Sequence, residues 1–407
     1  MDAPWHHQTV ICPDPSTLQE LVRELHQQAT PWLPSGLGTR LNWTSPVLPR
    51  PGEAEPFVVS TRQLNTLIEH RPGDFTVTVQ AGLPLLDLQT ALAGTNQWLP
   101  IDWPWGSGIQ GELSGSVGGL VARGLAGGLR QRHLGVRDHV IGIGVMRADG
   151  TIAKAGGQVV KNVAGYDLMR LFSGSWGSLG LITEVTLRTH PRPRLRSGLL
   201  MQGSVENLER LRQHCLNAPL PPQRLAWWSP ALAEEEHPAL LLTLASISTT
   251  AVAEQLHQLR GAADTYQVHV MQLEGEDLTL AESRGWGATN HGPAGPDTWL
   301  VHLGVLPANA KHLLKALAKL NLHCALAAGQ GQGFAWRWER GLQADQVGLL
   351  RERCRALGGD LTILIQPTVT NLPLSSWSAS SAQRWIQAIK REFDPLQQLA
   401  RGRLPGR

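Results

Sequence analysis

The chain has 407 residues, of which 42% are hydrophobic, and a formal charge of +3 from 36 basic and 33 acidic side chains. This length exceeds the usual size of one hydrophobic core and predicts two domains. The charges are scattered and nearly balanced, which excludes a typical nucleic-acid-binding surface. No run of apolar residues is long enough to predict a membrane-spanning helix, and the N-terminus lacks the pattern of a secretory signal. We therefore expect a cytoplasmic protein.

The four cysteines are widely separated and include no C-x-x-C pair: Cys12, Cys215, Cys324 and Cys354. This spacing encodes neither an iron–sulfur cluster nor a zinc ribbon, and we expect no metal site in this chain. The cysteines are predicted to be buried, reduced thiols.

The N-terminal part is predicted to alternate helices and strands. Residues 16–28 open with Ser16 and Gln19 at capping-box spacing and place leucines on one face, which predicts an amphipathic helix. A short strand and a glycine turn follow at 29–43. Residues 60–68 repeat the Ser and Gln spacing and predict a second helix, before the alternating strand at 75–82.

Two strands, 140–146 and 151–155, flank the dipeptide Asp149-Gly150 and predict a β-hairpin, so a purely parallel sheet is not expected. The segment PRPRLRSG that begins at Pro191 is typical of an exposed connection. We place the domain boundary near Pro193, with one domain at 1–193 and a second at 194–407.

The second domain is predicted to be α+β, with helices over an antiparallel sheet. Apolar strand-like segments at 239–246, 298–306 and 361–367 alternate with helices such as 309–320. The final helix is predicted at about 380–393. His302 and His323 are flanked by apolar strand residues and are interpreted as core histidines with satisfied hydrogen bonds.

The most informative segment runs from Gly106 to Gly180 and contains 19 of the 43 glycines. Glycine lets the backbone approach a ligand closely, so this crowding points to a large anionic ligand such as a dinucleotide. Residues 106–111 match G-x-G-x-x-G, but no buried strand precedes them and no acidic residue follows at the required distance. A nicotinamide-binding Rossmann motif is therefore disfavoured, and a Walker A loop is excluded.

Four separate segments form a coherent set: PSGLGT at 34–39, TVQAG at 78–82, SGSVGG at 114–119 and GSWGSLGLITE at 174–184. In order and spacing they resemble the PCMH-type FAD-binding domain of the vanillyl-alcohol oxidase family. The segments VGGLVARGLAGG, RHLGVRDHVIGI, 156–187 and FDPLQQLARGR resemble most closely the E-subunit family of bacterial glycolate oxidase. The resemblance implies a two-subdomain FAD domain and a C-terminal α+β cap domain, with the last residues returning to the FAD domain.

By this resemblance, FAD would be bound through backbone amides of small residues. The implied cofactor-binding residues are Pro34, Ser35, Gly36, Leu37, Gly38, Thr39, Gly82, Ser116, Val117, Gly118, Gly119, Gly180 and Ile182. The 34–39 loop has no histidine for a covalent link, so the FAD is expected to be noncovalent. Trp176 and Ala400 stand where relatives often have Glu and Asn. Lys161, Asn162, Tyr166 and Asp167 are expected to shape the turn before residue 174, and Tyr166 is a candidate to face the flavin.

The resemblance further implies glycolate oxidation to glyoxylate, with D-lactate as another substrate, in a complex with a second FAD subunit and an iron–sulfur subunit. Any contact with the inner membrane face would be through these partners. The metal-and-base segment of the catalytic D subunit has no counterpart here, and residues 325–336 are nearest to it by position. Two alternatives remain open: a noncatalytic flavoprotein scaffold, and a stand-alone FAD oxidoreductase acting on another alcohol or 2-hydroxy acid.

Oxidation of a 2-hydroxy acid needs a base for the hydroxyl and a cation for the carboxylate. The segment RQRHLGVRD offers His133 as a candidate base and Arg132 and Arg137 as candidate cations. The same residues are also typical of a solvated or ion-pairing loop.

Overall fold

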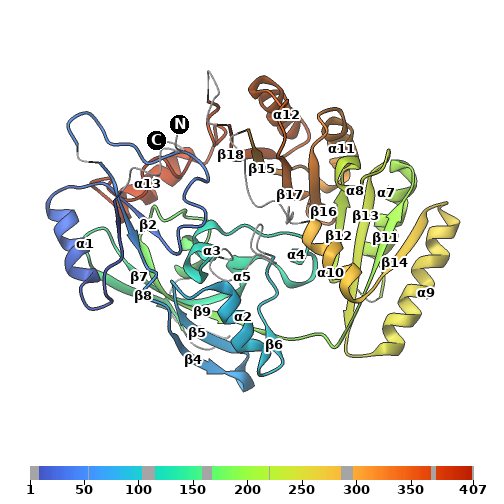
Figure 1. The fold of residues 1–407 in the computed structure, drawn as a ribbon, viewed down its shortest axis with the longest axis horizontal. Helices are drawn as coiled ribbons and strands as arrows, with labels where there is room; N and C mark the ends of the chain where they lie inside the picture. Colours follow the sequence, from blue (N-terminus) through green and yellow to red (C-terminus); the bar gives the residue numbers. More distant parts are fainter. Residues whose placement is uncertain are drawn as a thin grey trace.

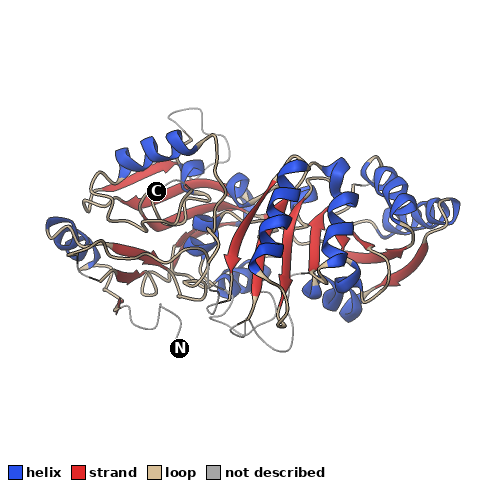
Figure 2. Ribbon diagram, turned by 90° about the horizontal axis from the view of Figure 1, so that it is seen from above, coloured by secondary structure: helices blue, strands red, loops and turns tan. Residues whose placement is uncertain are grey.

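The computed structural model describes residues 9–53, 55–102, 115–157, 167–219, 221–285, 297–367 and 373–405. Among the described residues, no helix is long and apolar enough to cross a bilayer. The chain forms two lobes, which lie left and right in Figure 1 and are seen from above in Figure 2. The fold is α+β, as predicted.

The first lobe contains a three-stranded parallel sheet in the order β1-β3-β2 and a five-stranded antiparallel sheet in the order β4-β5-β9-β7-β8. A two-stranded sheet pairs β6 with β10. The strands are β1 (Val10–Ile11), β2 (Trp32–Ser35), β3 (Phe57–Ser60), β4 (Leu67–Arg71), β5 (Thr76–Gln80), β6 (Gln97–Trp98), β7 (Val140–Met146), β8 (Ile152–Gly156), β9 (Leu181–Arg188) and β10 (His190–Pro191).

Short helices pack on this lobe. They are α1 (Leu18–Gln27), α2 (Leu85–Ala93), α3 (Val117–Arg123), α4 (Arg130–His133), α5 (Val136–His139) and α6 (Met169–Phe172). Helix α3 lies against β5 and β9, and Val117, Leu120 and Val121 enter a core shared with those strands. This contact holds the first turn of α3, which contains Gly118 and Gly119, against the sheet.

The second lobe is built on an eight-stranded antiparallel sheet in the order β14-β11-β13-β12-β16-β17-β15-β18. The strands are β11 (Leu195–Gln202), β12 (Arg224–Trp228), β13 (Ala239–Ser246), β14 (His269–Leu273), β15 (Trp299–Gly304), β16 (His323–Ala327), β17 (Gln332–Arg337) and β18 (Asp360–Ile365). The helices of this lobe are α7 (Val205–Leu216), α8 (Pro230–Ala233), α9 (Thr249–Thr265), α10 (Gly275–Arg284), α11 (Ala310–Lys319) and α12 (Ala344–Ala356); the last helix of the chain is α13 (Gln383–Phe393).

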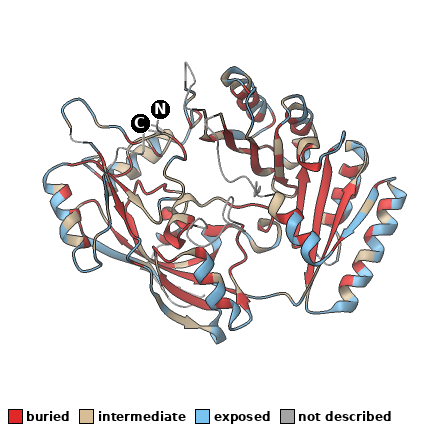
Figure 3. Ribbon diagram, viewed as in Figure 1, coloured by how far each residue is buried: buried red, intermediate tan, exposed pale blue. Residues whose placement is uncertain are grey.

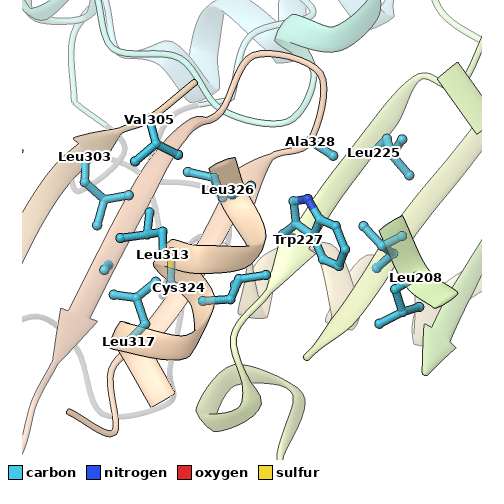
Figure 4. Close-up of a cluster of buried hydrophobic side chains, with 14 of the residues drawn as sticks. Leu208, Leu225, Trp227, Leu303, Val305, Leu313, Leu317, Cys324, Leu326 and Ala328 are labelled. Carbon is cyan, nitrogen blue, oxygen red and sulfur yellow. The ribbon is translucent and has the colours of Figure 1, made fainter. Parts of the chain in front are cut away.

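Side chains alternate between the two faces of this sheet, as the pleat requires. Val301 and Leu303 point into a core with leucines of the helices on one face, whereas Leu300 belongs to the core on the opposite face. Figure 4 shows the first core, where Leu313 and Leu317 of α11 pack beside Cys324 and Leu326 of β16. The solvent side of α9 is exposed while the strands behind it are buried (Figure 3). The opposite face of the sheet is therefore the one available to the first lobe.

The last helix and the residues after it lie against the first lobe. The amide of Trp32 donates to the carbonyl of Gln398 at 2.9 Å, and the amide of Ala400 donates back to the carbonyl of Trp32 at 2.9 Å. Lys390 Nζ donates to the carbonyl of Ser178 at 2.6 Å and pairs with the buried carboxylate of Asp394. Figure 1 shows α13, near the red end of the chain, in the lobe that contains β2.

Several local predictions are confirmed. The hairpin forms between β7 and β8, and helices form at α1 and α11. The strands predicted at 239–246, 298–306 and 361–367 correspond to β13, β15 and β18.

Three local predictions are wrong. Residues 60–68 form no helix, because Ser60 ends β3 and Leu67 begins β4. The capping box at Ser16 is absent, since α1 begins at Leu18 with Thr17 at its N-cap and no side-chain cap. Cys12 is exposed, whereas Cys215, Cys324 and Cys354 are buried.

Candidate FAD-binding site

The segments that the sequence singled out converge on one cavity of the first lobe. All of the predicted cofactor residues except Gly82 and Val117 line it. Three polypeptide segments form its walls: the loop after β2, the start of α3, and the segment from Trp176 into β9. The G-x-G-x-x-G match at 106–111 and the residues Lys161, Asn162 and Tyr166 lie outside the described residues.

The loop after β2 presents a row of backbone donors to the cavity. Within the described part of the chain, the amides of Gly36, Leu37, Gly38 and Thr39 donate no hydrogen bond to protein. Gly38 has a φ of +79°, a conformation that suits glycine. A row of free amides in a glycine turn is the arrangement that binds phosphate oxygens. The loop therefore fits a pyrophosphate.

The loop after β2 and the start of α3 approach each other closely at Gly36 and Ser116. A Cβ atom on Gly36 would lie 1.9 Å from Ser116 Oγ, so only glycine allows this approach. Ser116 is the N-cap of α3 and its Oγ accepts a hydrogen bond from the Gly119 amide at 3.2 Å. Ser116 thus has a structural role besides lining the cavity.

The amides of Val117, Gly118 and Gly119 donate hydrogen bonds within the protein. Val117 donates to the Leu83 carbonyl at 3.0 Å, and Gly118 donates to the Ala81 carbonyl at 2.7 Å. A Cβ on Gly118 would lie 2.7 Å from the Ala81 side chain, so this glycine allows α3 to approach β5. Gly82 packs in the same way, since its Cβ would lie 1.8 Å from the Thr61 carbonyl oxygen. Direct bonding of these residues to FAD remains a prediction.

Three arginines, which the sequence did not indicate, also line the cavity: Arg403 is buried, and Arg40 and Arg123 are half-buried. Arg123 donates to the carbonyl of Arg40 at 2.6 Å. Its guanidinium carbon lies 5.6 Å from the ring centre of Trp43 and 5.4 Å from that of Trp176. Arg403 comes from the C-terminal segment and donates to the carbonyl of Leu41 at 2.6 Å.

Burial disfavours the charged forms of these arginines. It lowers the pKa of Arg40 and of Arg403 to about 10. The pKa of Arg123 falls well below its usual value, through burial first and then through repulsion by Arg40 and Arg403. An anion in the cavity would reverse this effect, because a nearby negative charge favours the cationic form. The electrostatics of the cavity therefore suit a phosphate-bearing ligand.

One signal in the sequence could have identified two of these arginines. Arg40 follows the PSGLGT loop directly. Arg123 comes four residues after Gly119, so Gly119 and Arg123 lie on the same face of α3. Trp43 and Arg403 carry no such signal, because their positions depend on tertiary contacts. Trp176 adopts a φ of +55°, and its amide donates to the Ala122 carbonyl at 2.8 Å.

The candidate catalytic residues lie elsewhere. Arg132, His133 and Arg137 line neither this cavity nor the one beside it. Arg132 donates to the carbonyl of Ala245 at 2.9 Å and so connects α4 to β13, while Arg137 is exposed. His133 packs edge-on against Trp98 and His190, with ring centres 5.7 and 5.2 Å apart. Within the described ranges, no cluster of three or more possible metal ligands occurs.

The comparisons with known proteins agree with this geometry. Residues 7–156 match the FAD binding domain family. The N-terminal part of this chain is an FAD-binding domain. Its cofactor is FAD, and the fold is of the PCMH type.

Among relatives, the chain is 37% identical over 167 residues to the glycolate oxidase subunit GlcE of Escherichia coli, an alignment that covers 41% of this chain and 46% of that protein. It is 35% identical over 188 residues to the glycolate oxidase subunit GlcD of Bacillus subtilis, covering 46% of this chain and 37% of that one. The chain thus matches less than half the length of these curated relatives.

The fold extends over both lobes in solved structures. Alkyldihydroxyacetonephosphate synthase superposes with a TM-score of 0.66 over 96% of this chain and 76% of its own, at 15% sequence identity. This similarity concerns the fold and includes the second lobe, which the family match does not reach.

Proposed function

We propose that this chain is an FAD-dependent dehydrogenase subunit that oxidises a small 2-hydroxy acid, with glycolate as the first candidate and D-lactate as the second. The observation that carries the proposal is the cavity in which four free amides and three arginines converge. The match to glycolate oxidase subunits of two bacteria supports the choice of substrate.

Within this proposal each wall of the cavity has a task. The amides of Gly36, Leu37, Gly38 and Thr39 bind the pyrophosphate, and Gly180 and Ile182 contact the adenosine end. Arg40, Arg123 and Arg403 balance negative charge. Bound FAD supplies the acceptor for the two electrons that leave the hydroxyl-bearing carbon.

The electrons then need an acceptor outside this chain. Among the described residues, no group of three or more His, Cys, Asp or Glu side chains could hold a metal ion, so the proposal places the iron–sulfur relay in a partner subunit, together with a second flavoprotein. The assembly is proposed to be cytoplasmic, with any contact with the inner membrane face made through its partners.

The test is spectroscopic. The full chain loaded with FAD is mixed anaerobically with glycolate, and the flavin absorbance near 450 nm is followed, alone and after co-expression with a catalytic flavoprotein and a cysteine-rich subunit. We expect glycolate-dependent bleaching, and dye-linked turnover that rises by orders of magnitude in the co-purified complex. Flavin that stays oxidised with every 2-hydroxy acid, in the chain and in the complex, would overturn the proposal and leave the noncatalytic scaffold or an oxidoreductase that acts on another alcohol.

A further inference from the structure

A second cavity of about 350 Å³ adjoins the FAD cavity. The two share Arg123, Leu125 and Trp176. The second cavity lies where α6, α13 and the end of the chain meet the face of the eight-stranded sheet that carries Leu364. Most of its wall is apolar and includes Leu171, Leu179, Leu364, Ile386 and Ile389.

Three residues that line this cavity each carry a buried polar atom that makes no hydrogen bond with any described residue: Arg123 Nε, Ser175 Oγ and Trp377 Nε1. Buried polar groups without partners are rare in native proteins and call for an explanation. A guanidinium and an indole can only donate hydrogen bonds, and a serine hydroxyl can donate as well. Together these groups match a ligand rich in acceptors, such as a carboxylate.

A titratable group lies in the same wall. His302 follows Leu300 by two residues, so its side chain is on the face of the sheet that is turned toward the first lobe. Its ring centre is 5.1 Å from that of Phe334, and it makes no hydrogen bond within the described part of the chain. Burial lowers the pKa of His302 to about 4, so the imidazole is neutral at pH 7. The interpretation of His302 as a histidine with satisfied hydrogen bonds is therefore wrong.

Size and lining describe the rest of the ligand. The volume is within the range of about 300–1,000 Å³ that is typical of pockets for drug-sized molecules, and it is about ten times the share of one water molecule. Glycolate has five heavy atoms and no apolar side chain, so it would leave most of this apolar surface uncovered. A longer hydrocarbon side chain would cover it.

We propose that this cavity binds a carboxylic acid whose apolar side chain has several carbon atoms, with Arg123, Ser175 and Trp377 as donors to the carboxylate. His302 is then the neutral group beside the bound acid that can accept a hydrogen bond from a 2-hydroxyl. This second statement rests on the proposed function, because it requires a 2-hydroxy acid, whereas binding of the carboxylate does not.

The experiment measures binding to the full FAD-loaded chain by titration calorimetry, with probes that have no oxidisable hydroxyl. The probes are 4-methylpentanoate, acetate, the neutral 4-methylpentanamide, and AMP. We expect 4-methylpentanoate to bind at least tenfold more tightly than acetate or the amide. Comparison with acetate measures the contribution of the apolar side chain, and comparison with the amide measures that of the negative charge.

Variants locate the site. Arg123→Met should weaken binding of 4-methylpentanoate by about tenfold or more, the size expected for a lost hydrogen bond to a charged group. Ser175→Ala removes a hydroxyl that makes no hydrogen bond with any described residue, so the variant should fold normally and still weaken binding. Thr362→Phe should fill the cavity and abolish binding. Arg137→Met, at an exposed position, is the matched control for Arg123 and should have no effect.

Equal affinity for acetate and 4-methylpentanoate, or binding unchanged in Ser175→Ala and Thr362→Phe, would overturn the inference. AMP binding that Thr362→Phe abolishes would also overturn it and assign the cavity to the nucleotide part of the cofactor. The outcome for the proposed function is separate: glycolate that bleaches the flavin without any binding of 4-methylpentanoate contradicts this inference alone. Binding of 4-methylpentanoate without bleaching by any 2-hydroxy acid contradicts the proposed function alone.

Discussion

Asp102 and Arg224 form a buried ion pair between the two lobes, with Arg224 Nη2 donating to Asp102 Oδ1 at 2.8 Å. Asp102 follows β6, and Arg224 begins β12 of the eight-stranded sheet. The other carboxylate oxygen of Asp102 accepts from the Leu129 amide at 2.5 Å, and Arg224 Nε lies 3.6 Å from Glu282. This network fixes the first lobe against the sheet that carries His302.

Replacing Asp102 by Asn should destabilise the protein by about 3 kcal/mol, because breaking a buried ion pair leaves the remaining charge without full compensation. This cost is at the low end of the roughly 3–5 kcal/mol that is usual for breaking a buried ion pair, because Glu282 stays near Arg224. Urea unfolding at pH 7 measures the change. The control is Asp297→Asn in the pair with the exposed Arg340, which should destabilise the protein far less because solvent screens that pair. Equal effects at both positions would contradict the role of Asp102.

A negative charge in the loop after β2 should weaken FAD binding. Thr39 lines the cavity next to the free amides, so Thr39→Asp places a carboxylate where phosphate must approach. We expect FAD affinity to fall by about tenfold or more, and Thr39→Asn, which has the same shape without the charge, to fall far less. Flavin fluorescence titration of the apoprotein distinguishes the two. Equal losses in both variants would indicate a steric effect instead.

FAD should be released by denaturation. Among the described residues that line the cavity there is no histidine, cysteine or tyrosine, the side chains that could form a covalent bond to the flavin. Precipitation with trichloroacetic acid should therefore leave all the yellow colour in the supernatant. A yellow pellet after washing would show a covalent link and contradict this expectation.

Stability should depend on pH through a cluster of three histidines. Burial, followed by neighbouring charges, lowers the pKa of His133 to about 3 and that of His190 to about 4, and burial lowers that of His139. The unfolded chain takes up these protons near pH 6.5, before the folded chain does. The cluster thus stabilises the fold above pH 6.5, and this contribution is lost as the pH falls toward 4.

Asp102 acts in the opposite direction, since burial raises its pKa to about 6 against the attraction of Arg224. The stability that comes from preferential protonation of Asp102 in the folded chain is present below about pH 4 and is lost as the pH rises through 6. A difference measurement separates the two effects: His133→Phe should gain stability relative to the natural protein as the pH falls from 6.5 to 4. His257→Phe on the exposed side of α9 is the control. If the difference in free energy of unfolding between His133→Phe and the natural protein does not change with pH, the histidine cluster is not the cause of the pH dependence.

The sequence by itself determined the order of the FAD-binding segments and the strong local elements. The hairpin at Asp149-Gly150 and the helix α11 follow from short-range turn chemistry and side-chain periodicity, and they formed where predicted. The 34–39 loop was recognised because close backbone approach to phosphate demands small residues there. The helix predicted at 60–68 failed because pairing of β3 with β1 and β2, a long-range interaction, overrides a local capping signal.

Only the tertiary structure decided which side chains complete the sites. Arg403 reaches the FAD cavity because the C-terminal segment returns to β2, more than 350 residues earlier in the chain. His302 became a candidate functional group because the register of β15 with β17 and β18 turns it toward a cavity. His133 did not, because its ring packs against the ring of His190. Local sequence does not predict such positions, since they arise from contacts between segments that lie far apart in the chain.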